Sequence, residues 1–157
     1  MKTDTLPGQE YYPSADEVDQ WVASVWQAAE DATCRAEILD QQGFTHSLGI
    51  RHMPGFQYVR FEPAGMEPFY GYWQPALSGP APLLVHVPGY GTEMSTHPEL
   101  PAQGFSVLHV SPLGYATPDG ADESKKRNGS WPVLPDTVLS GATEGYRVWL
   151  ANCIQAT

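Results

Sequence analysis

Two short and almost uninterrupted apolar runs limit most strongly how this chain can fold. They cover residues 82–87 and 105–110, with 17 residues between them. Strands buried on both faces of a parallel sheet have such runs, because neither face meets water. Parallel neighbours need a crossover connection, and the intervening segment has room for one with a short helix that ends at Gly104. We therefore predict a parallel β-α-β unit over residues 82–110.

The residues before this unit predict a helix and an antiparallel meander. Ser14 and Glu17 have the spacing of a capping box, and apolar residues then recur at helical spacing. We expect a surface helix over residues 14–39. The strand candidates that follow are residues 45–52, 57–62 and 69–74, separated by clusters of proline and glycine. Their close spacing favours an antiparallel meander over residues 45–74.

The residues after the unit predict a long loop and a final helix. Residues 112–142 are irregular, and a loop of this length is usually functional or mobile. Over residues 143–157, apolar side chains recur at helical spacing; they are Tyr146, Trp149, Leu150 and Cys153. Residues 1–157 thus form a single α/β domain, a mixed sheet with an antiparallel start and then parallel strands with flanking helices.

The predicted sheet has an open side. A parallel sheet is covered by helices and continued by strands, yet the strand into which the last helix should lead is absent. We therefore expect the sheet to be incomplete, with an unpaired edge beside the strand that ends at Val110.

Charge and hydropathy exclude several classes of partner. The formal net charge is −10 and the sequence pI is about 4.7, so the surface repels the phosphates of nucleic acids. No apolar run approaches the length of a membrane span, and the N-terminal residues lack the apolar core of a signal peptide. We expect a cytoplasmic protein without a nucleic-acid or membrane partner. Cys34 and Cys153 have no metal or redox spacing and are predicted to be buried free thiols.

The segment most informative about chemistry follows the first apolar run. It reads Pro88, Gly89, Tyr90, Gly91 and then Thr92. This segment comes at the carboxyl end of a predicted parallel strand, where open α/β sheets bind ligands. The two glycines let the backbone bend and approach a ligand closely, so that an N–H can point at a developing negative charge. An ordinary strand-to-helix turn would have the same pattern.

From residue 82 to residue 157 the sequence resembles the start of the α/β-hydrolase core, and it looks most like the esterase and prolyl-oligopeptidase-like branches. In that family an apolar strand ends in a His-Gly-x-Gly turn, and the N–H of the residue after His-Gly helps to form the oxyanion hole. The resemblance gives this role to the backbone amide of Tyr90. Gly89 and Gly91 then belong to the substrate-binding turn.

Two positions depart from the family pattern, and the nucleophile is missing. Pro88 stands where the family has His, and Ser111 stands where it has Asp. The sequence contains no Gly-x-Ser-x-Gly motif, and in the family the nucleophile, the acid and the His all follow the oxyanion turn. The resemblance implies a cofactor-free serine esterase for a small-molecule ester. Its triad would lie in a C-terminal half, in the same gene or in a separate chain, and this chain alone is expected to be inactive.

Other readings remain open. A peptidase or an amidase would use the same fold, and the changes at Pro88 and Ser111 favour a non-catalytic binding or assembly module. A split enzyme would need a second chain. Tyr115 and Trp131 are candidates for the substrate wall, because aromatic residues on loops at this end of a sheet often line apolar pockets.

The histidines do not read as a triad base or as a metal site. His86 and His109 lie in the two predicted parallel strands and could come close together. A metal would need a third ligand and an open position, so we expect hydrogen-bonded core histidines and no metal. His97, just before Glu99, could line a cleft but is read as a helix start. The basic run at residues 125–127 is read as a solvated loop.

Overall fold

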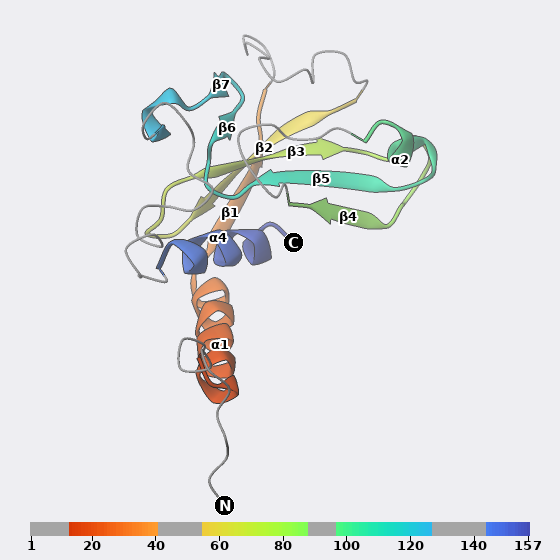
Figure 1. Cartoon of the computed structure of the whole chain (residues 1–157). Helices are drawn as coiled ribbons and strands as arrows, with labels where there is room; N and C mark the ends of the chain where they lie inside the picture. The colour runs from red at the N-terminus through yellow and green to blue at the C-terminus, as the bar shows by residue number, and fades with distance from the viewer. Residues whose placement is uncertain (1–12, 41–54, 88–96, 127–143) are drawn as a thin grey trace, which may run out of the picture.

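A computed structural model describes residues 13–40, 55–87, 97–126 and 144–157 (Figure 1). Its centre is a five-stranded sheet with the order β1-β2-β3-β5-β4. The strands are β1 (Cys34–Ile38), β2 (Gln57–Pro63), β3 (Phe69–Gln74), β4 (Leu83–His86) and β5 (Ser106–Ser111). The α-helices are α1 (Ala15–Asp31), α2 (Glu99–Ala102) and α4 (Glu144–Gln155).

The strand pairing confirms the predicted fold class. β1, β2, β3 and β5 pair antiparallel in that order, whereas β4 pairs parallel with β5. The crossover between β4 and β5 contains the short helix α2, and Gly104 follows it with a φ of +89°. The result is a mixed sheet with flanking helices, a partial α/β arrangement consistent with an α/β-hydrolase fold.

Helix α1 begins as the sequence predicts but ends earlier. The Glu17 N–H donates to Ser14 Oγ at 3.3 Å, and the Ser14 N–H donates to Glu17 Oε2 at 2.8 Å, which completes the capping box. The prediction of a helix to residue 39 is wrong, because β1 forms there and pairs along its whole length with β2. The Gln155 side chain donates to the carbonyls of Ala29 and Ala32 at 3.3 and 3.2 Å. These bonds satisfy two carbonyl groups where the helix ends.

The open side of the sheet also differs from the prediction. β5 lies between β3 and β4 and is buried along its whole length, so no edge is open beside Val110. Within the part of the chain that the structure describes, the two edge strands are β1 and β4, and β4 is the edge next to β5. Leu83 and Leu84 are 44% and 38% exposed there, although the apolar run predicted a buried strand. The prediction that this strand is buried is therefore wrong for Leu83 and Leu84, because β4 lies at the edge of the described sheet and has a partner strand on one side only.

Part of the predicted loop is ordered. A small hairpin of β6 (Ala116–Thr117) and β7 (Gly120–Ala121) follows β5, and a 3₁₀ helix, η2 (Glu123–Lys125), follows the hairpin. The prediction of irregular chain is therefore wrong for this first part. The strand predicted at 45–52 and the loop beyond residue 126 lie outside the described residues. None of the described helices is long and apolar enough to cross a membrane.

The sheet has different neighbours on its two faces. One core cluster includes Phe61, Phe69, Leu108 and Val110 together with Ala156, the residue after α4, so the end of α4 lies against this face. Figure 1 shows α1 reaching away from the sheet, with α4 between it and the strands. The other cluster contains Tyr58, Tyr72 and Ala116. Cys34 and Cys153 are free thiols, as predicted, but both are only partly buried; burial raises the pKa of Cys153 to about 11.

The fit between β3 and β5 at Gly71 gives the first prediction. A Cβ there would lie 3.0 Å from Leu108 Cδ1, 3.0 Å from Phe61 Cε2 and 3.2 Å from the carbonyl oxygen of His109. We expect Gly71→Ala to lower the free energy of unfolding by about 1–3 kcal/mol, because overpacking strains the sheet. Urea denaturation followed by tryptophan fluorescence measures this, with Ser78→Ala at an exposed position as the control. Equal stability of both variants would show that the sheet relaxes freely at Gly71.

Candidate functional site

The carboxyl ends of β4 and β5 lie side by side and form the candidate site. The two strands run parallel, and the register pairs His86 with His109. Ligands of open α/β sheets bind beyond this end of the strands. Two groups of side chains gather there: a histidine cluster, defined as His86, His97 and His109, and a polar network around the turn that follows β5.

His109 is the centre of the histidine cluster and is fully buried. Its Nε2 lies 2.8 Å from Gln74 Oε1 on β3, and its Nδ1 lies 3.0 Å from Nδ1 of His86. An amide oxygen only accepts, so His109 Nε2 carries the proton and donates to Gln74. His109 Nδ1 then accepts from the Nδ1–H of His86. These hydrogen bonds confirm the prediction that the two strands bring hydrogen-bonded histidines together.

His97 is the member of the cluster that the sequence analysis named as a possible cleft residue but did not group with His86 and His109. Its ring lies 5.2 Å from the His86 ring and stacks on the His109 ring at 5.8 Å, centre to centre. Its Nδ1 is 3.3 Å from a carboxylate oxygen of Glu99. The reading of this segment as a helix start is correct, since α2 begins at Glu99. His97 joins the other two rings because of the path of the connection between β4 and β5, and no spacing in the sequence indicates this position.

The surroundings keep the two inner rings neutral. Burial, together with the neighbouring His86 and His97, lowers the pKa of His109 to about 4. Burial also lowers the pKa of His86, and His97 adds to that effect. Among the residues that the structure describes, no group of three histidine, cysteine or carboxylate side chains could hold a metal ion. Because the His97 ring stacks on the His109 ring, the nitrogens of the two rings do not converge on one point where a metal ion could bind.

The turn after β5 is closed by Ser111, the residue that stands where the family has Asp. Its Oγ accepts from the N–H of Ala116 at 3.1 Å, and its carbonyl accepts from the N–H of Gly114 at 2.9 Å. Gly114 has a φ of +65°, a conformation that favours glycine. Ser111 is therefore a structural residue of this turn.

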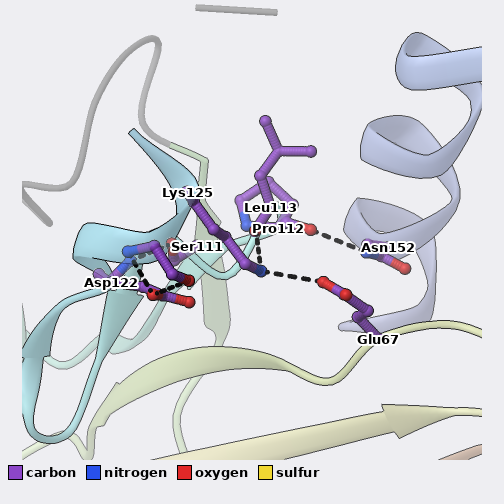
Figure 2. A network of polar contacts seen from close by, with 9 residues as sticks. Glu67, Ser111, Pro112, Leu113, Asp122, Lys125 and Asn152 are labelled. Atoms are coloured by element: carbon purple, nitrogen blue, oxygen red, sulfur yellow. Dashed lines mark hydrogen bonds and ion pairs between the residues drawn. The ribbon is translucent and has the colours of Figure 1, made fainter. Parts of the chain in front are cut away.

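Side chains from two other elements hold the same turn (Figure 2). Asn152 on α4 donates to the carbonyl of Pro112 at 2.7 Å. Lys125 donates to the carbonyl of Leu113 at 3.0 Å and pairs with Glu67 at 3.2 Å. The reading of the basic run as a solvated loop is thus wrong for Lys125, whose ammonium group ties η2 to the turn.

The structure describes one of the predicted site residues. Gly89, Tyr90, Gly91 and Trp131 lie outside the described residues. Tyr115 is only 7% exposed, and its carbonyl accepts from the N–H of Asp122 at 2.8 Å. Its ring belongs to the packed interior next to the turn, and its part in a substrate wall stays a prediction.

The comparisons with known proteins bear on the fold. No model of a known protein family matches the chain, and no curated protein matches its sequence. Among solved structures, the chain is similar to an acetyl xylan esterase from Paenibacillus sp. R4, with a TM-score of 0.54 and 15% sequence identity. The match covers 94% of this chain and 48% of the esterase, so the chain spans about half of that protein's length. At this identity the likeness shows a shared fold.

The turn network predicts that two adjacent lysines differ in their effect on stability. Lys125→Met removes the donor to Leu113 and the partner of Glu67, and we expect it to lower the free energy of unfolding by about 1–2 kcal/mol. Lys126 pairs with the exposed Glu123 three residues away, so Lys126→Met is the matched control and should change stability by about 0.5 kcal/mol or less. Thermal and urea unfolding compare the two variants. A larger loss for Lys126→Met would contradict the role given to Lys125.

Proposed function

We propose that this chain is the N-terminal part of a serine esterase that cleaves small carboxylic esters through an acyl-enzyme. The observation that supports this most is the parallel pairing of β4 with β5. β4 ends at His86, and Tyr90 follows four residues later, beyond the carboxyl end of a strand that lies beside the most buried strand. Ligands bind at this end of α/β sheets, and the fold is similar to that of an acetyl xylan esterase.

The reaction needs a donor for the charge that appears on the ester carbonyl oxygen. A serine from outside these 157 residues, deprotonated by a histidine, attacks the carbonyl carbon, and the oxygen becomes an oxyanion. The Tyr90 N–H donates to this oxygen, and Gly89 and Gly91 leave room for the substrate beside the backbone. The histidine then protonates the leaving alcohol, and water releases the acid in a second, similar step. The donor contributes little to substrate binding, because the charge develops in the transition state and is complete only in the tetrahedral intermediate.

The decisive variant removes one hydrogen-bond donor and keeps every side chain. In the complete enzyme, an ester in place of the peptide bond at Tyr90 deletes its N–H and keeps the side chain. We expect kcat to fall by about 10²–10³, the usual loss for one oxyanion-hole donor. Tyr90→Phe is the matched control, and it should leave kcat nearly unchanged because the phenol is not the donor. Full turnover of the ester-substituted enzyme would show that the amide has no such role.

The missing nucleophile gives a separate prediction for the chain by itself. The 157-residue chain should not hydrolyse p-nitrophenyl acetate above a buffer blank, and a serine-directed fluorophosphonate should not label it. Stoichiometric labelling would reveal a nucleophile within the chain.

A non-catalytic binding or assembly module is the second candidate. Pro88 and Ser111 favour it, since Ser111 serves the turn in place of the family's acidic residue. The protein encoded by the complete gene, treated with the same fluorophosphonate, distinguishes the two. A labelled serine in a Gly-x-Ser-x-Gly motif supports the esterase, whereas a complete protein without a reactive serine supports the module.

A further inference from the structure

The histidine cluster is not used by the proposed acyl transfer, and it joins the edge strand to the interior of the sheet. β4 contributes only four residues to its ladder with β5, and two of them, Leu83 and Leu84, are exposed. Its last residue, His86, is bound through its side chain to His109 of β5, and His109 is bound to Gln74 of β3. These two side-chain hydrogen bonds connect β4, β5 and β3 at the carboxyl end of β4.

We propose that the histidine cluster is a pH-sensitive fastening, a set of hydrogen bonds that holds β4 to the sheet. It is closed, with the bond between His86 and His109 formed, while His109 is neutral. It is open, with this bond broken, once His109 is protonated. The two Nδ1 atoms of His86 and His109 are 3.0 Å apart, so one of them must donate and the other accept. Gln74 fixes the proton of His109 on Nε2, which leaves Nδ1 as the acceptor. A proton on this Nδ1 puts two N–H groups face to face, and the bond is lost.

The groups around His109 do not compensate a positive charge. From β3 it faces Gln74, which is neutral, and Tyr72, whose ring centre is 5.7 Å away and whose pKa is raised by burial. The Tyr58 phenol of β2 is neutral too, because burial raises its pKa. From β4 it faces a second imidazole. From the segment before α2 it faces His97, and the nearby carboxylate of Glu99 contacts His97 rather than His109.

The sign of the effect follows from the direction of the pKa shift. His109 has a pKa of about 4 in the closed state, against 6.5 for an ordinary histidine. The open state therefore binds the proton more tightly, and opening becomes more favourable as the pH falls from 6.5 towards 4. At neutral pH this histidine keeps the fastening closed, and below the folded pKa its contribution to closure is lost.

Hydrogen exchange of the full chain tests the fastening without any substrate. Protection factors of the β4 amides, corrected for the intrinsic pH dependence of exchange, should fall about 20-fold from about pH 7 to about pH 5, because opening takes up one proton. The amides of β2 should keep their protection over the same range. His109→Gln keeps a neutral side chain that can bond to His86, so in this variant the protection of β4 should not depend on pH. His97→Gln is the matched control, and it should retain the pH dependence.

A second measurement covers the case in which His109→Gln does not fold. Histidine titration of the unmodified chain by NMR should place His109 well below an ordinary histidine, with the β4 amide shifts changing at the same midpoint. The proposal is overturned if His109 titrates near 6.5 or above, or if β4 protection is constant with pH. It is equally overturned if His109→Gln leaves the pH dependence intact.

Discussion

β5 can lie in the middle of the sheet only because both of its edges have hydrogen-bond partners. It pairs antiparallel with β3 and parallel with β4, and all six of its residues are buried. A buried backbone without these partners would leave polar groups unsatisfied at a high energetic cost. The antiparallel side needs no crossover, but the parallel side does, and the crossover brings α2 and His97 to the end of the strands. The candidate site is a consequence of how β5 is paired.

The same strand separates two chemically different faces. Leu108 and Val110 face the apolar cluster next to α4, whereas His109 faces Tyr72 on the opposite side. An imidazole that is fully buried among tyrosines is stable there because each of its nitrogens has a partner. The turn that follows β5 is tied to α4 by Asn152, so the position of the last helix and the position of the site are linked.

The sequence predicted the elements whose signals are local. The capping box of Ser14 and Glu17 marked the start of α1, and the two apolar runs marked β4 and β5 with their parallel pairing. β1 was missed because its pairing with β2 comes from distant residues, and the helical spacing continued into it. The exposure of β4 depends on strand order, which apolar character does not encode. That His86 and His109 lie close together could be predicted from the adjacency of their strands alone. The position of His97 depends on the path of the crossover, and the role of Lys125 depends on the path of the chain after β5, and neither path could be predicted from the sequence.

We propose that the segment after β4 presents a backbone donor to an ester oxyanion. A crystal structure of the complete protein, after reaction with an alkyl fluorophosphonate, tests this most directly, because the adduct resembles the tetrahedral intermediate. The account predicts a phosphonylated serine from outside these 157 residues, with its phosphonyl oxygen about 3 Å from the backbone nitrogen of Tyr90. An adduct whose oxygen is bound by other donors, with the Tyr90 amide turned away from it, would contradict the account.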